Sequence, residues 1–227
     1  MKNVLVDALP LGSRWELFIE LDKIDDYIDT VIDDHLFSAK NDKFGALTSA
    51  LDKNVYSCLI FKKAKLTSAF PFYYSTKGLL KAKIKKIHTT RLGDAYLTCE
   101  INGHEICAVS VDYSFNKRAY SKKMNLYFSA IAYNFSKIDL QTKLAKPFVK
   151  VNSGFLDEYT ITCSISENMG YDFIVIPEKM PGFTLPLLAK EIYMQKPRVG
   201  NNASGDIWLT CFSEDFSVRL EKALIER

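Results

Sequence analysis

The sequence lacks the short motifs that mark the commonest enzyme and metal-binding classes. It has no G-x-S-x-G, no P-loop signature, no G-x-G-x-x-G, no H-E-x-x-H and no C-x-x-C pair. Histidine is scarce, with only His35, His88 and His104 among the 227 residues. We therefore expect neither a metal site nor a cofactor, and nothing indicates the hydrolase, nucleotide-binding or metalloprotease classes that those motifs define.

Long apolar runs are missing as well. No stretch approaches 18 consecutive apolar residues, and Asp7 and Pro10 interrupt the short apolar segment at the N-terminus. The five cysteines are odd in number, and each lies in an apolar run, which is typical of buried, reduced thiols rather than of a disulfide framework. These features predict a cytoplasmic protein with no membrane partner.

The apolar pattern predicts one α+β domain over residues 1–227, with a point of division into two lobes near residues 116–124. We expect a mostly antiparallel sheet and a few helices. The predicted elements include a strand at 13–22, helices at 22–35 and 44–56, strands around 80–113, 146–151, 158–165, 171–177 and 205–212, and helices from Thr184 and from Glu214, the last with Val218, Leu220, Leu224 and Ile225 as its packing residues.

The strongest local signal is a β-hairpin. The segments AYLTCEI and HEICAVSVDY alternate apolar and polar residues and are joined by Asn102-Gly103. A two-residue Asn-Gly loop supplies the positive φ angles of a type I′ turn, whose twist matches that of paired strands. We therefore predict that residues 95–101 and 104–113 pair as antiparallel strands.

Charged residues are concentrated in two blocks of opposite sign. Residues 16–34 carry eight acids and one lysine, whereas residues 62–91 carry eight lysines, one arginine and no acid. Side chains alternate along a strand, so LLKAKIKKIH places three lysines on one face. Each block is compatible with a solvated face or with a charged partner. The candidate anion-binding residues are Lys81, Lys83, Lys85, Lys86, His88 and Arg91.

His35 is the histidine whose setting best fits acid–base chemistry. It follows Asp34 and precedes the predicted helix at 44–56. An imidazole whose other nitrogen has a partner is suited to proton transfer near pH 7. The simpler interpretation is a partly exposed histidine where two elements meet, and both interpretations stay open.

In pattern, DDHLFSAKNDKFGAL and LGDAYLTCEI resemble segments of the hot-dog-fold acyl-thioester proteins, which include dehydratases and thioesterases. KMPGFTLPLLAKEIYMQ is similar to a helix start in the acyl-carrier-protein dehydratases, although Leu187 stands where that family has an acid. The resemblance implies a long sheet wrapped around a central helix. It also implies a site in which Asp34 and His35 supply acid–base chemistry, while backbone N–H groups near Gly45 hold the thioester oxygen.

Three functions follow from these patterns. The first is an acyl-thioester enzyme or acyl-binding protein whose partner is an acyl carrier protein or a CoA thioester. The second is a non-enzymatic interaction or adaptor protein with one acidic and one basic face, for which a dimer of this chain is a candidate assembly. The third is a nucleic-acid-binding module with Phe70, Phe72, Tyr73 and Tyr74 as base-stacking groups.

Overall fold

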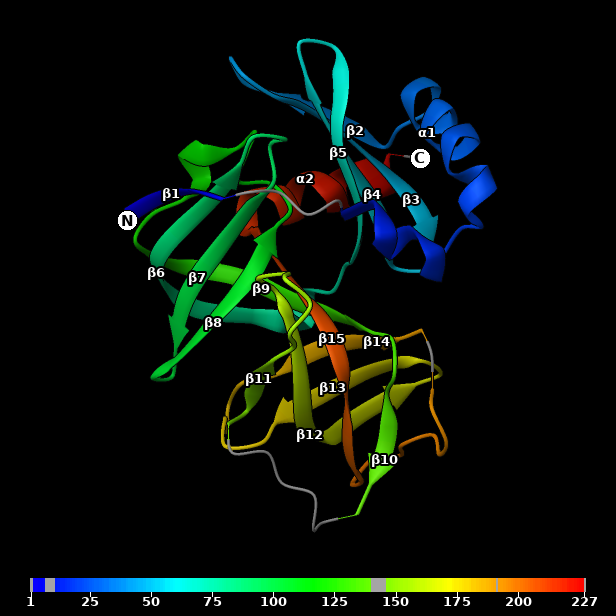
Figure 1. Cartoon of the computed structure of the whole chain (residues 1–227), viewed down its shortest axis with the longest axis vertical. Coiled ribbons are helices and arrows are strands. Elements are labelled where there is room, and N and C mark those ends of the chain that lie inside the picture. Colours follow the sequence, from blue (N-terminus) through cyan, green and yellow to red (C-terminus); the bar gives the residue numbers. More distant parts are fainter. Residues whose placement is uncertain (1, 7–10, 140–145, 191, 227) are drawn as a thin grey trace.

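The protein is mostly β-structure. The computed structural model describes residues 2–6, 11–139, 146–190 and 192–226, of which 52% lie in strands, and only two α-helices occur in these ranges (Figure 1). The α+β, hot-dog-like class that we predicted is therefore wrong. The strands are β1 (Lys2–Val6), β2 (Phe37–Lys40), β3 (Gly45–Asp52), β4 (Val55–Lys62), β5 (Lys65–Tyr73), β6 (Leu79–Thr90), β7 (Ala95–Ile101), β8 (His104–Ser110), β9 (Lys123–Ala132), β10 (Ser136–Ile138), β11 (Phe148–Lys150), β12 (Glu158–Met169), β13 (Asp172–Pro177), β14 (Leu185–Ala189) and β15 (Asn202–Ser213).

Eight of these strands close into a ring, in the order β6-β7-β8-β15-β12-β13-β14-β9. Within the ring β9 also pairs directly with β15. This pairing divides the ring into two five-stranded barrels that share β9 and β15. The first barrel contains β6, β7 and β8, and the second contains β12, β13 and β14; they lie at the upper left and at the bottom of Figure 1.

The two barrels repeat one arrangement of four strands, β6–β9 and β12–β15. In each unit the first strand has 12 residues and a bulge, and it pairs with both the second and the fourth strand. The third strand of each unit pairs in parallel with the fourth strand of the other unit. The units thus share their fourth strands, and each barrel has the strand order of an OB-type barrel, a likeness of fold that implies no function.

The Asn-Gly hairpin is confirmed, although its second strand ends at Ser110 and not at residue 113. β7 and β8 pair from Ala95–Ser110 to Ile101–His104, and Asn102 and Gly103 have φ angles of 49° and 80°. The alternation along β6 is confirmed too, since Ala82 and Ile84 are buried while the lysines between and beside them point outward. The five cysteines are buried and free, as predicted.

Two predicted helices are strands instead. Residues 44–56 form β3, a turn and the start of β4, in a separate four-stranded sheet of order β2-β3-β4-β5. Residues 185–189 form β14, which lies between β13 and β9 and is buried along its whole length. β14 is a short apolar run that is buried on both faces, and such a run shows no periodicity by which a strand can be distinguished from a helix. In both segments the pairing with neighbouring strands determines the structure.

The two α-helices were predicted. α1 (Ile24–Asp33) lies against the four-stranded sheet, where Val31 is buried and the Tyr27 hydroxyl contacts the Ala50 carbonyl at 3.0 Å. α2 (Glu214–Ile225) packs between this sheet and the first barrel through Phe216 and Leu220. Of its four predicted packing residues only Leu220 is buried, whereas Val218, Leu224 and Ile225 are exposed. The other large apolar side chain that packs is Phe216, four residues before Leu220 on the same face of the helix.

The segment predicted as an initial strand is a 3-10 helix, Leu11–Leu17. It carries Arg14, whose buried guanidinium donates two hydrogen bonds, of 2.7 and 2.8 Å, to the buried carboxylate of Asp157. The guanidinium also lies 4.8 Å from the ring centre of Phe155 and 5.0 Å from that of Trp208. This ion pair fixes the N-terminal segment to the second barrel, and contacts of the Arg14 and Trp15 side chains, rather than strand pairing, hold this part of the chain.

No helix in the described ranges is both long enough and apolar enough to cross a membrane.

Replacing Gly103 with valine should lower the free energy of unfolding by about 1–2 kcal/mol, because a β-branched residue is strained at φ near 80°. Urea unfolding measures this. Asn102→Gly is the matched control and should leave the midpoint nearly unchanged, since glycine accepts positive φ. An unchanged midpoint for Gly103→Val would contradict the proposed turn strain.

Replacing Asp157 with alanine should cost about 3–5 kcal/mol, because it leaves the Arg14 guanidinium buried without its counter-ion. The double variant Arg14→Met/Asp157→Leu should regain most of that loss, since an apolar pair of similar volume removes both desolvation costs. Unfolding in urea distinguishes the two. If the double variant were as unstable as Asp157→Ala, the buried charge would not be the cause.

Candidate anion-binding cleft

The structure does not assemble the predicted acyl-thioester site. Asp34 and His35 form the bend between α1 and β2, beside the middle of β3, where the Leu36 amide donates to the Thr48 carbonyl. Gly45 begins β3, three residues away along the strand, or roughly 10 Å. No helix starts at Gly45, so there are no free helix N–H groups there to hold a thioester oxygen.

The predicted lysine face lies on β6, but part of its charge is neutralised. Lys83 and Lys85 both pair with Glu100, at 3.1 and 2.7 Å. Lys81 and Lys86 are exposed.

His88 lies on β6 beside these lysines, whereas Arg91 follows the strand. The His88 Nε2 atom lies 3.0 Å from the Thr98 hydroxyl, and burial, together with nearby Lys86 and Lys150, lowers the pKa of this imidazole. Arg91 lies in the turn between β6 and β7 and contributes to a different site, described next. Arg91 therefore stands apart from the rest of the predicted set.

The predicted base-stacking residues are not available for stacking. Phe70, Phe72 and Tyr73 are buried, and Phe72 and Phe70 belong to the core between the four-stranded sheet, the first barrel and α2. Tyr74 is half-buried, and its hydroxyl contacts Ser217 and Glu221. These four rings hold the sheet to the barrel.

A cleft with strongly positive lining lies where the β2–β3 turn meets the first barrel. Two adjoining cavities of about 520 and 370 Å³ share Lys43 and Lys117 in their walls. Phe44 and Phe115 add apolar surface. One acid, Asp42, lines the cavities, together with seven cations: Lys40, Lys43, Lys62, Arg91, Lys117, Arg118 and Arg219. We call this site the basic cleft.

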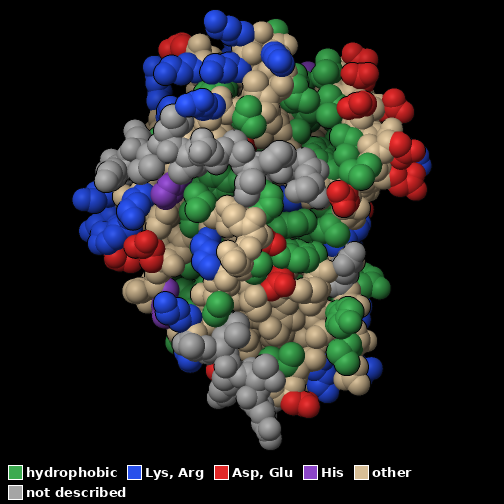
Figure 2. Space-filling view, viewed as in Figure 1, with side chains coloured by type: hydrophobic (Ala, Val, Ile, Leu, Met, Phe, Trp, Pro, Cys, Tyr) green, Lys and Arg blue, Asp and Glu red, His purple; other side chains and the backbone are tan. Residues whose placement is uncertain are grey.

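Most of these cations have no counter-ion. Arg219 pairs with Asp215 at 3.0 Å. The other six form no ion pair with any residue that the structure describes, although Lys62 and Lys117 lie over the rings of Phe44 and Tyr113. Six unneutralised charges around one hollow repel each other and create a local field that attracts an anion. On the face drawn in Figure 2, Lys and Arg side chains gather at the top and left, and acids gather at the upper right, over α1.

Hydrogen bonds hold the walls of the cleft in place. Asn41 in the β2–β3 turn accepts from the amides of Lys43 and Phe44, at 2.9 Å each, and donates to the Ser114 carbonyl at 2.8 Å. The Ser114 hydroxyl in turn donates to the Gly93 carbonyl. Three segments that are distant in sequence are therefore tied together around the hollow, so it is built in advance of any ligand.

Asp112 organises the opposite wall. This buried carboxylate accepts hydrogen bonds from Asn116 at 3.0 Å, from the amide and hydroxyl of Ser213 at 3.1 and 2.5 Å, and from the Tyr120 hydroxyl. Ser213 caps the N-terminus of α2 by accepting from the Phe216 amide. Asp112 thus fixes both segments that supply the wall, residues 116–120 and α2.

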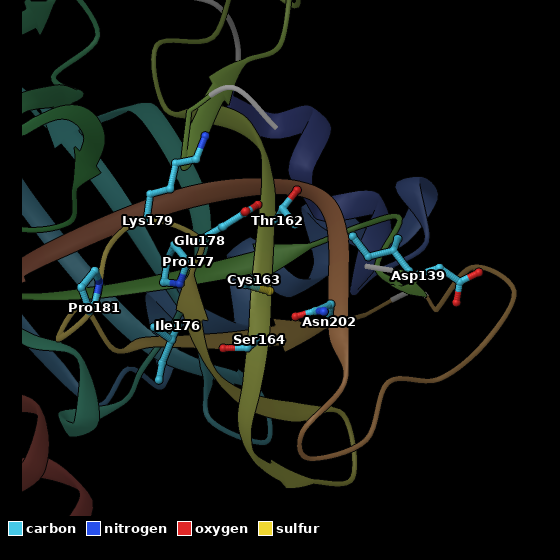
Figure 3. A pocket seen from close by; sticks show the side chains of 11 residues that line it. Asp139, Thr162, Cys163, Ser164, Ile176, Pro177, Glu178, Lys179, Pro181 and Asn202 are labelled. Carbon is cyan, nitrogen blue, oxygen red and sulfur yellow. The ribbon is translucent and has the colours of Figure 1, made fainter. Parts of the chain in front are cut away.

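Two other clefts lie in the second barrel. One, of about 330 Å³, is lined by residues of mixed charge that include Asp139, Glu178 and Lys179, and by the Thr162 side chain, which lies beside Glu178 (Figure 3). The other carries three cations, Lys137, Lys196 and Arg198. No group of three His, Cys, Asp or Glu in the described ranges could hold a metal ion. The basic cleft has more cations in its walls than either of these two clefts.

The residues of the basic cleft were mostly not identified from the sequence. Arg91 was among the predicted residues and Lys62 belongs to the basic block, but the remaining five lie outside residues 62–91. The signal that could have indicated them is the cation-rich segment NKRAYSKK, which contains Lys117 and Arg118.

Asp112 should make stability depend on pH. Burial raises the pKa of its carboxyl above the ordinary value of 3.8, despite the opposing hydrogen bonds. A raised pKa means that the folded state holds the proton more tightly, so this contribution to stability is complete below pH 3.8 and is lost as the pH rises through the folded-state pKa. Measured by urea unfolding, the wild type should lose stability relative to Asp112→Asn as the pH is raised above 3.8. Parallel curves would contradict this.

The chain matches no protein-family model, no curated protein and no solved structure.

Proposed function

We propose that this chain is a non-enzymatic interaction protein that binds an acidic protein segment in its basic cleft. The observation that carries the proposal is the set of six cations that form no ion pair within the described part of the chain and that surround a hollow of fixed shape. A carboxylate-rich segment would supply the missing negative charge, and the surfaces of Phe44 and Phe115 would accept apolar groups that accompany it. We expect this charge complementarity to increase mainly the rate of association and the specificity for the partner.

An acidic protein segment accounts for the cleft better than the other two functions do. The acyl-thioester mechanism depended on helix N–H groups at Gly45, which begins a strand. The nucleic-acid function depended on base stacking by four residues, of which three are buried and the fourth, Tyr74, is half-buried with its hydroxyl bonded to Ser217 and Glu221. What remains is charge complementarity, which a run of carboxylates satisfies without any stacking group.

The test is binding of a fluorescein-labelled oligoglutamate peptide, measured by anisotropy at several salt concentrations. Neutralising two cleft cations, in Lys117→Gln/Arg118→Gln, should weaken binding by about tenfold at low salt, because two charge contacts of about 0.7 kcal/mol each are lost. The salt dependence of the affinity should also become shallower, since fewer charges are screened.

The matched control removes one lysine and one arginine from the second barrel, in Lys137→Gln/Arg198→Gln. Both residues are exposed and form no ion pair within the described part of the chain. This variant should bind the peptide within about twofold of the wild type, since its cationic charge lies outside the cleft. Equal weakening by both double variants would contradict a localised site, and tighter binding of oligothymidylate than of oligoglutamate would favour the nucleic-acid function instead.

A further inference from the structure

The acidic helix α1 carries charge that the protein does not neutralise. Among the carboxylates of residues 16–33, the only ion pair within the described part of the chain is between Glu20 and Lys23. Asp25, Asp29 and Asp33 follow one another at intervals of four, so neighbouring turns place like charges side by side, which destabilises a helix. No basic residue lies in the last turn, where a cation would complement the helix dipole and where Asp33 instead opposes it.

The side of α1 that faces away from the sheet also exposes apolar side chains. Val31 and Tyr27 anchor the helix on the sheet, through burial and through the contacts of the Tyr27 hydroxyl with the Ala50 carbonyl and with Ser57. Ile32 is 45% exposed, and Leu21, just before the helix, is 62% exposed. α1 therefore presents carboxylates with accompanying apolar groups, which complement the cations and the apolar surface of the basic cleft.

We propose that the acidic segment bound by the basic cleft is α1 of a second copy of this chain. This inference rests on the function proposed above and names the partner. The argument is charge complementarity: six cations without counter-ions line the cleft, and α1 has a row of aspartates for which the structure gives no ion pair, so docking would relieve both. The formal net charge of only +3 opposes the approach of two copies weakly.

A molecule cannot place its own α1 in its own cleft, because Tyr27 and Val31 hold α1 on the sheet. The contact is therefore between two different surfaces, α1 of one copy and the cleft of the next. Such a head-to-tail contact leaves one helix and one cleft unoccupied at the ends, so it generates open chains, or rings if the rotation closes. The assembly should grow with protein concentration and dissociate in salt.

The experiment uses two variants of the full chain, followed by sedimentation velocity in low and high salt. The cleft variant is Lys117→Gln/Arg118→Gln, and the helix variant is Asp25→Asn/Asp29→Asn. Wild type should form oligomers that grow with concentration, while each variant alone should stay monomeric. An equimolar mixture should form a 1:1 dimer that grows no further, because the intact helix of one variant fills the intact cleft of the other.

Two further measurements keep the proposal open to failure. Lys137→Gln/Arg198→Gln should assemble as the wild type does, and circular dichroism should confirm that the helix variant stays folded. A wild type that is monomeric at every concentration in low salt would overturn the inference, as would a helix variant that still assembles. Oligoglutamate binding separates the two proposals: if the helix variant binds the peptide and the wild type does not self-associate, the cleft function stands and only the partner is wrong.

Discussion

The antiparallel pairing of β9 with β15 is the contact on which both barrels depend. Leu209–Ser213 of β15 pairs with Leu126–Ala130 of β9, and the side chains of Ser129 and Thr210 meet at 2.9 Å within it. The first half of β9 pairs with β6 and its last residues pair with β14. In the same way, the first half of β15 pairs with β12 and a later part pairs with β8. Each barrel closes only because these two strands continue through it, so neither barrel has a complete sheet without the other's fourth strand.

Close packing around the shared strands leaves little freedom in the sequence. A Cβ atom at Gly205 in β15 would lie 2.9 Å from the Phe135 Cα atom. One at Gly78, just before β6, would lie 1.9 Å from the Phe128 carbonyl oxygen of β9. Both positions require glycine because backbone approaches backbone there, not because of a special φ angle. The same arrangement sets the place of the basic cleft, since β8 ends near Asp112 and β15 ends at Ser213, and these two residues bond to each other.

The sequence was informative wherever structure is decided locally. Asn102-Gly103 defines its own turn, and the apolar spacing of residues 22–35 and 214–225 is sufficient for two amphipathic helices. It was not informative where pairing with strands distant in the chain determines the secondary structure. Leu185–Ala189 is a strand because β13 and β9 lie on either side, and Gly45 begins a strand because β2 and β4 do. The pairing of β9 with β15 joins segments about 80 residues apart, and no local sequence pattern indicates such a pairing.

The candidate site follows the same rule. The two charged blocks were visible in the sequence, but which cations stay unneutralised depends on Glu100, which pairs with Lys83 and Lys85 from a neighbouring strand. The cleft collects its cations from the ends of β2, β4, β6, the β8–β9 connection and α2. Convergence of five chain segments at one place is a property of the closed barrel and of the sheet that packs on it.

The most direct test of the shared-strand architecture is native-state hydrogen exchange. If β9 and β15 hold both barrels, the slowest amides of β7 in the first barrel and of β13 in the second should exchange through the same global unfolding, with equal opening free energies and equal denaturant dependence. Exchange of β13 amides through a smaller opening that leaves β7 protected would contradict the account, because the second barrel would then unfold without the first.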